Sequence, residues 1–131
     1  MTAGDYPLTL LTASLLALIY LFLCINVVRY RRKAGVAIGV SDADLEQVFR
    51  AQANFAEYVP FALILFALLE NAGANNFVML GLSVILITAR ILHAWGITRP
   101  TSLGLGRTIG ASATVLALLV MSIMGLSIFF G

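Results

Sequence analysis

Three polar side chains are spaced so that they fall on one face of a helix within a largely apolar stretch. Arg50, Asn54 and Glu57 lie at positions i, i+4 and i+7. At about 100° per residue, these positions fall within roughly 60° of one another. An arginine can bind a carboxylate through two parallel hydrogen bonds, and a glutamate can accept an ammonium group or hold a second arginine. The stripe is therefore typical of a site for a ligand that carries an amine and more than one anionic group.

A second pair of polar residues lies at matching depth in another apolar stretch. Arg90 and His93 are three positions apart and share a helix face. Counted from Glu70 and from Phe77, which lie on either side of a polar turn, Glu57 and Arg90 are each thirteen residues in, which is roughly 20 Å of helix. Asn54 and His93 each lie sixteen residues in, about one turn further. We therefore expect an acid and a base at one level, with an amide and an imidazole above them.

Each of these residues also has a structural explanation. Arg50 alone is most simply an anchor at the membrane boundary, and Glu57 with Arg90 can form a buried structural ion pair. His93 alone is more often a hydrogen-bonded polar residue than a proton carrier. The basic cluster at 29–33 can serve as an orientation signal and a contact for anionic lipids. The functional interpretation rests on the coincidence of these residues at one depth and on one side of the chain.

The elements that position these residues are four apolar stretches in a chain of 131 residues. Hydrophobic residues make up 61% of the sequence and charged residues 11%, against roughly 25% charged in a soluble domain. A soluble, disordered or disulfide-stapled protein is thereby excluded, and with one Cys (Cys24) and one His we expect no metal site. We predict a single all-α domain, 1–131, an integral membrane four-helix bundle whose spans are about 8–28, 51–69, 77–97 and 109–130.

The basic residues predict the orientation of this bundle. All eight fall in the first and third connections or the helix halves beside them, and none lies in the second connection or at the termini. They are Arg29, Arg31, Arg32, Lys33, Arg50, Arg90, Arg99 and Arg107. By the positive-inside rule, the first and third connections face the cytoplasm and both termini lie outside. The residues before the first span carry Asp5 and no basic residue, so we do not expect a cleaved signal peptide.

The second helix is expected to start before its apolar stretch. Ser41 and Asp44 resemble a capping box, and a helix from Asp42 to Glu70 would be roughly 43 Å long. Its first turns would then stand outside the hydrocarbon on the cytoplasmic side. Pro60 lies within this helix and is expected to bend its axis.

The eleven residues from Arg50 to Pro60, RAQANFAEYVP, resemble the signature of the MAPEG proteins, the membrane-associated proteins in eicosanoid and glutathione metabolism. The second helix of that family carries R-x-x-x-N-x-x-E, often continued as E-Y-x-P. The resemblance extends over the whole chain, with four spans, a basic first cytoplasmic loop and an Arg-x-x-His pair, Arg90 and His93, near the end of the third helix. It implies a homotrimer that binds glutathione between neighbouring subunits at the cytoplasmic helix ends.

The resemblance also implies roles for individual residues. Arg107, at the start of the fourth helix, would be the catalytic residue that stabilises the glutathione thiolate, with Arg99 as an alternative in the same loop. Gln52 would reach the ligand from an adjacent subunit, and Ile97 stands where several members have a ligand-contacting tyrosine. The expected glutathione-binding residues are Arg29, Arg50, Gln52, Asn54, Glu57, Tyr58, Arg90 and His93.

Three functions follow as hypotheses. The first is a membrane-bound glutathione transferase or peroxidase, which uses glutathione as co-substrate and acts on lipophilic electrophiles from the bilayer. The second is a non-catalytic scaffold or anionic-lipid-binding protein with the same fold. The third is a small multidrug transporter in which Glu57 carries protons, although an arginine at matching depth would keep that carboxylate ionised. We expect a homotrimer in contact with membrane lipids, in a bacterial inner membrane, and no nucleic-acid partner.

Overall fold

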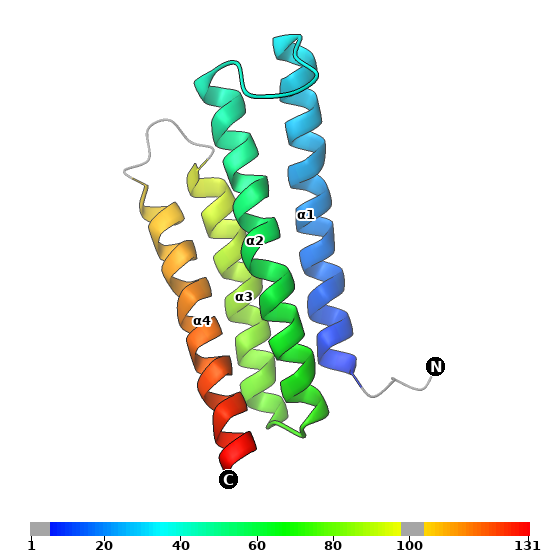
Figure 1. Cartoon of the computed structure of the whole chain (residues 1–131), viewed down its shortest axis with the longest axis vertical. Coiled ribbons are helices and arrows are strands. Elements are labelled where there is room, and N and C mark those ends of the chain that lie inside the picture. The colour runs from blue at the N-terminus through cyan, green and yellow to red at the C-terminus, as the bar shows by residue number, and fades with distance from the viewer. Residues whose placement is uncertain (1–5, 98–103) are drawn as a thin grey trace.

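Four long α-helices make up the protein (Figure 1). The computed structural model describes residues 6–97 and 104–131. The helices are α1 (Pro7–Ala34), α2 (Ala43–Asn71), α3 (Asn76–Ile97) and α4 (Leu105–Phe130). Each is long and apolar enough to cross a membrane, and the described ranges contain no β-strand. The prediction of an all-α chain with four membrane-length helices is confirmed.

The helices run alternately up and down, so the bundle has two different ends. At one end, which we call the connection end, α1 and α3 finish and α2 and α4 begin. At the other, the turn end, α1 begins, α4 finishes and a short turn joins α2 to α3 (Figure 1). The helix ends on either side of the two basic connections therefore lie at the same end of the molecule.

Local residue chemistry sets the helix ends at the connection end. The C-cap of α1 is Gly35, whose φ of 69° lies in the left-handed region that favours glycine. α2 is capped by Asp42, whose Oδ1 accepts a hydrogen bond of 2.8 Å from the Leu45 amide. That bond lowers the pKa of Asp42, helped by a hydrogen bond from the Ser41 hydroxyl. The expected cap at Ser41 was therefore one residue early, because the side chain of Ser41 bonds to Asp42 instead.

At the turn end, a carboxylate from α2 caps the start of α1. Glu70 accepts hydrogen bonds from the amides of Leu8, at 2.8 Å, and Thr9, at 2.7 Å. These are two of the first amides of α1, which have no acceptor within their own helix. Nearby, the hydroxyls of Thr12 and Ser83 share a buried hydrogen bond of 2.7 Å between α1 and α3. The turn end is thus held by side-chain bonds between helices that are distant in sequence.

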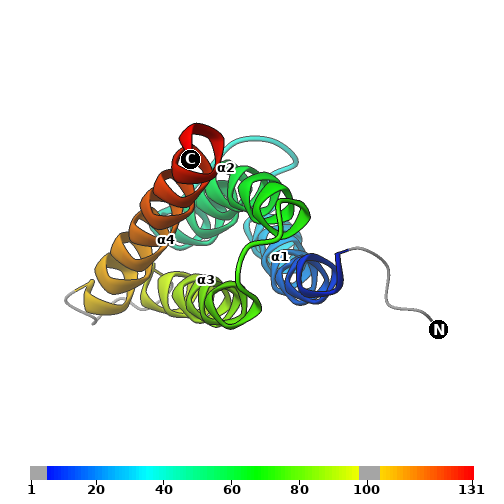
Figure 2. The ribbon, with the colours of Figure 1, turned by 90° about the horizontal axis from the view of Figure 1, so that it is seen from below.

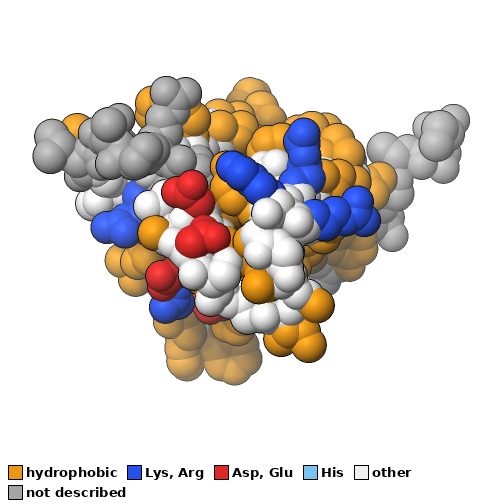
Figure 3. Space-filling view, turned by 90° about the horizontal axis from the view of Figure 1, so that it is seen from above, with side chains coloured by type: hydrophobic (Ala, Val, Ile, Leu, Met, Phe, Trp, Pro, Cys, Tyr) orange, Lys and Arg blue, Asp and Glu red, His pale blue; other side chains and the backbone are white. Residues whose placement is uncertain are grey.

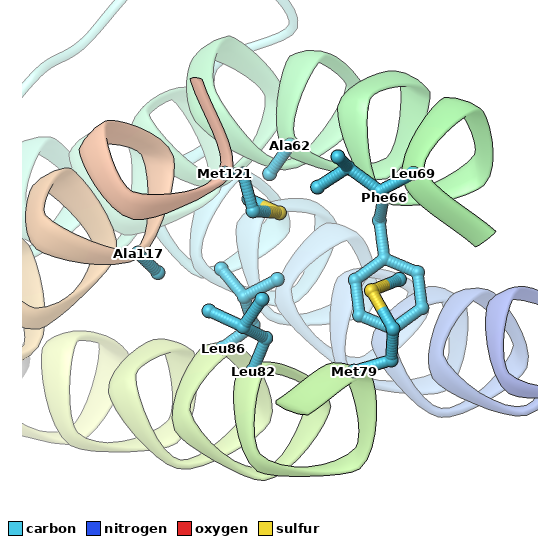
Figure 4. Close-up of a cluster of buried hydrophobic side chains, with 8 residues drawn as sticks. All are labelled: Ala62, Phe66, Leu69, Met79, Leu82, Leu86, Ala117 and Met121. Atoms are coloured by element: carbon cyan, nitrogen blue, oxygen red, sulfur yellow. The ribbon is translucent and has the colours of Figure 1, made fainter. Parts of the chain in front are cut away.

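The helices pack mainly as two sequential pairs, α1 with α2 and α3 with α4. α2 also touches α3 and α4, whereas α1 and α4 lie on opposite sides of the bundle (Figure 2). α2 continues through Pro60 without interruption. The core near the turn end comes from α2, α3 and α4 (Figure 4), and its buried residues are Ala62, Phe66, Leu69, Met79, Leu82, Leu86, Ala117 and Met121.

Glycines let α3 and α4 approach closely near the connection end. A Cβ placed on Gly110 would lie 2.6 Å from the amide nitrogen and 2.8 Å from the Cβ of His93, and would also meet the carbonyl oxygen of Ala89. One placed on Gly96 would lie 2.6 Å from the carbonyl carbon of Gly106. Gly106 and Gly110 form a G-x-x-x-G pattern, which permits close packing of membrane helices. The spacing between His93 on α3 and the first turns of α4 is therefore set by backbone contact.

Candidate functional site

A cavity of about 450 Å³ lies between α2, α3 and α4 at the connection end. This volume falls within the roughly 300–1,000 Å³ of small-molecule sites. Polar and charged side chains from all three helices line it, together with two alanines. The lining residues are Ala43, Glu46, Gln47, Arg50, Ala53, Asn54, Glu57, His93 and Arg107.

Five of the nine predicted site residues meet in this cavity. Arg50, Asn54 and Glu57 come from consecutive turns of α2, His93 comes from α3 and Arg107 from the first turn of α4. His93 is buried, whereas Arg50, Glu57 and Arg107 are exposed on the cavity wall. The spacing of the stripe on α2 and the close approach of α3 to α4 bring them together.

Arg90 lies beside this cavity. It is 1% exposed, and its Nη1 donates a hydrogen bond of 2.9 Å to Oδ1 of Asn54. Its Nε is buried and has no hydrogen-bond partner within the described ranges. Arg90 and Asn54 also line a cavity of about 30 Å³ with Tyr58 and Thr114. Arg90 therefore holds the amide of Asn54, whose side chain reaches both cavities.

Glu57 and Arg90 do not form the buried ion pair that was the structural explanation for them. Arg90 points into the packed seam between α2 and α3 and finds the neutral amide of Asn54, while Glu57 stands on the exposed side of α2. Among the described residues, the ion pair is Arg50 with Glu46, at 4.0 Å on the helix surface. Exposed pairs of this kind contribute little to stability, so Arg50 can exchange Glu46 for a ligand at small cost.

The charges of the cavity are mixed. Two guanidinium groups, Arg50 and Arg107, face it together with two carboxylates, Glu46 and Glu57. The end-on view of the connection end shows the same mixture, with Asp and Glu side chains grouped between Lys and Arg side chains (Figure 3). A lining of this kind can bind a ligand that carries carboxylates and an ammonium group at once.

Two predicted residues lie away from the cavity in this chain. Arg29 is exposed on α1, a helix that does not contribute to the cavity. Gln52 faces α1, where its Nε2 donates a hydrogen bond of 2.7 Å to the hydroxyl of Tyr20. Arg99 lies outside the described residues, and Ile97 is the last residue of α3.

Glu46 and Gln47 also line the cavity, although they were not among the site residues predicted from the sequence. The α2 stripe gave the signal for Gln47, since it precedes Arg50 by three residues and Asn54 by seven, which keeps it on the same helix face. Glu46 lies one turn before Arg50 and pairs with it. The stripe therefore extends through the first turns of α2, at 43–50, as the cavity does.

Comparison with known proteins identifies the family of this chain. The model of the MAPEG family matches residues 9–127, which include all the site residues discussed above. The inner membrane protein YecN of Escherichia coli strain K12 is 32% identical over 117 residues, which cover 88% of both chains. The protein of the same name from Escherichia coli O6:H1 has the same identity and coverage. On the match along nearly its whole length, this chain belongs to the MAPEG family.

Proposed function

We propose that this protein binds glutathione in the cavity between α2, α3 and α4 and transfers it to lipophilic electrophiles. The observation that carries the proposal is the convergence of Arg50, Asn54, Glu57, His93 and Arg107 around about 450 Å³. Glutathione carries two carboxylates and one ammonium group. In the lining, Arg50 complements one of the carboxylates and Glu57 complements the ammonium group.

In this proposal the α2 stripe holds the tripeptide. Arg50 binds a carboxylate after leaving Glu46, and Glu57 receives the ammonium group. Arg90 keeps the Asn54 amide in place through its hydrogen bond, so that the amide can bind the peptide backbone. Tyr58, next to Asn54 in the small cavity, completes the α2 contribution.

The chemistry falls to the thiol of the ligand and to Arg107. A nearby cation lowers a thiol pKa and so raises the fraction of thiolate at neutral pH. The thiolate attacks the electrophilic carbon, a carbon–sulfur bond forms, and the leaving group departs with its electron pair. With a lipid hydroperoxide, two glutathione molecules would instead be oxidised to their disulfide as the peroxide is reduced. The protein contributes proximity and charge stabilisation.

The positions of Arg29 and Gln52 favour a homotrimer within this proposal. Both lie toward α1, away from the cavity of their own subunit, so they would reach glutathione only from a neighbouring subunit. The lipophilic substrate would enter from the bilayer along the exposed apolar helix faces.

We also infer that the cavity faces the cytoplasm of a bacterial cell. The cavity is at the same end as both basic connections, which the positive-inside rule assigns to the cytoplasm. The name of the relative, an inner membrane protein, supports placement in the inner membrane. In a Cys24→Ser background, cysteines introduced at Gly73 should react with an impermeant reagent from outside, and those at Gly35 should not. The reverse pattern would overturn this orientation.

Calorimetric titration of the purified full-length protein with glutathione tests the binding. Glu57→Gln should weaken binding by about 1–3 kcal/mol, the usual effect of losing one hydrogen-bonded charge. Arg50→Ala should also weaken it. Arg32→Ala removes an exposed cation at the end of α1, outside the cavity, and should change little. Equal small effects from all three variants would contradict a defined glutathione site.

A further inference from the structure

A second cavity lies on the other side of α3, in a groove between α1 and α3. Its volume is about 670 Å³, and it shares no lining residue with the cavity of the proposed function. Apolar side chains line most of it, including Phe22 of α1 and Ile91 of α3, with Val48 of α2 also in the lining. Trp95 of α3 also lines it and is 52% exposed.

Polar groups occur in this groove toward the connection end. Asn26 and Tyr30 follow Phe22 along α1 at intervals of four residues, so all three share one helix face. Neither Asn26 nor Tyr30 has a side-chain hydrogen bond to any residue in the described ranges. A side-chain amide in a membrane-spanning helix is costly without a hydrogen-bond partner. The side chains of Asn26 and Tyr30 can therefore bind a ligand that is apolar at one end and polar at the other.

Positive charge continues along the same face of α1. Arg29 and Lys33 are three and seven residues after Asn26, which places both on its face of the helix. Both are exposed at the end of α1. Arg32 is equally exposed but lies six residues after Asn26, a rotation of roughly 120° away from the groove.

We propose that the groove between α1 and α3 is a binding site for one anionic phospholipid. An acyl chain lies against Phe22, Ile91 and Trp95. The ester region meets Asn26 and Tyr30, and Lys33 binds the head-group phosphate. The sequence of apolar, polar and cationic groups along α1 matches the order of these parts in a phospholipid. Because the groove and the glutathione cavity have no residue in common, this inference stands independently of the proposed function.

Trp95 provides a direct test, since it is the one tryptophan of the chain and it lines the groove. The full-length protein is reconstituted in phosphatidylcholine vesicles, and a fixed fraction of the lipid is replaced by phosphatidylglycerol or phosphatidylcholine with brominated acyl chains. Bromine quenches tryptophan fluorescence at contact range. We expect brominated phosphatidylglycerol to quench Trp95 more strongly than brominated phosphatidylcholine at equal fraction.

A matched pair of variants locates the charge responsible. One lysine near an anionic head group changes binding about five-fold, so Lys33→Ala should reduce the preference for phosphatidylglycerol by about that factor. Arg32→Ala removes the same charge from the neighbouring position and should reduce the preference less than about two-fold. Equal losses in the two variants would mean diffuse attraction to the basic helix end and would overturn the site.

Two further results would also overturn the proposal. Equal quenching by the two brominated lipids in the unmodified protein would mean that the groove does not select the head group. Absence of quenching by either lipid would mean that protein covers the groove, for example a second copy of this chain.

Discussion

Replacing Gly110 with alanine tests the claim that backbone contact between α3 and α4 positions the site. The new Cβ would lie 2.6 Å from the amide nitrogen and 2.8 Å from the Cβ of His93. Ordinary contact begins near 3.4 Å, so these two contacts alone would require a shift of about 0.6–0.8 Å. The carbonyl oxygen of Ala89 lies nearer still, so the two helices would have to separate by more than this. Overpacking of this kind costs about 1–3 kcal/mol. Because the contact atoms are backbone and Cβ, no side-chain rotation can relieve it.

Gly125→Ala is the matched control, since it makes the same change in the same helix. A Cβ on Gly125 meets nothing within 4 Å, and alanine favours a helix over glycine by about 1 kcal/mol in water. We therefore expect Gly110→Ala to lower the midpoint of thermal unfolding in detergent by several degrees and Gly125→Ala to leave it unchanged or raise it.

The same two variants connect packing to ligand binding. In Gly110→Ala, the side of the cavity that contains His93 moves relative to Arg107. The glutathione affinity measured by calorimetry should therefore fall as well. Gly125→Ala should bind like the unmodified protein, because Gly125 lies far along α4 from the cavity. If the two variants unfold at the same temperature and bind alike, the close approach of α3 and α4 does not constrain the site.

Three further predictions address separate parts of the structure. Arg107→Ala should leave glutathione affinity nearly intact but raise the thiol pKa of the bound ligand, which is measured by thiolate absorbance against pH. It should also slow conjugation to chlorodinitrobenzene, and the rate should partly recover at higher pH. If Arg99→Ala produces the pKa shift instead, the role belongs to Arg99. Glu70→Ala leaves two amides of α1 without their acceptor and should destabilise the fold by about 1–3 kcal/mol. The unfolding temperature should then fall while glutathione affinity stays unchanged. A variant as stable as the unmodified protein would contradict the cap. The pKa of Asp42 is lowered in the folded protein, so its cap stabilises α2 fully at pH values above the aspartate pKa of the unfolded chain. This contribution is lost as the pH falls through the pKa of Asp42 in the folded protein. Unfolding temperatures measured from pH 6 to pH 3, a range about the ordinary aspartate pKa, should therefore fall less steeply in Asp42→Asn.

The sequence was sufficient to predict the helices and the α2 stripe because both depend on local periodicity. Largely apolar runs that are long enough to span a bilayer can form little else than a helix. Arg50, Asn54 and Glu57 share a face in any α-helix that contains them, and they do line one cavity.

Contacts between distant residues were not predictable in the same way. Glu70 appeared as part of a polar turn, and only tertiary structure brings its carboxylate to the first amides of α1. Equal depth allowed a pairing of Glu57 with Arg90 as one alternative, but depth says nothing about which side of a helix faces its neighbour. The rotation of α3 places the guanidinium against Asn54 instead.

The hydrogen bond between Arg90 and Asn54 also has a consequence for assembly of the chain in the membrane. The dominant contacts join α1 to α2 and α3 to α4, so each pair can form as a helical hairpin from residues close in sequence, before the hairpins dock. Sliding one hairpin past the other by one turn would move the helices about 5.4 Å and leave a buried guanidinium without its amide. Such a loss is costly in a medium without water. The Arg90–Asn54 bond therefore fixes how the two hairpins are aligned along the bundle axis. It thereby also fixes the positions of Glu57 and His93 relative to one another along the cavity wall.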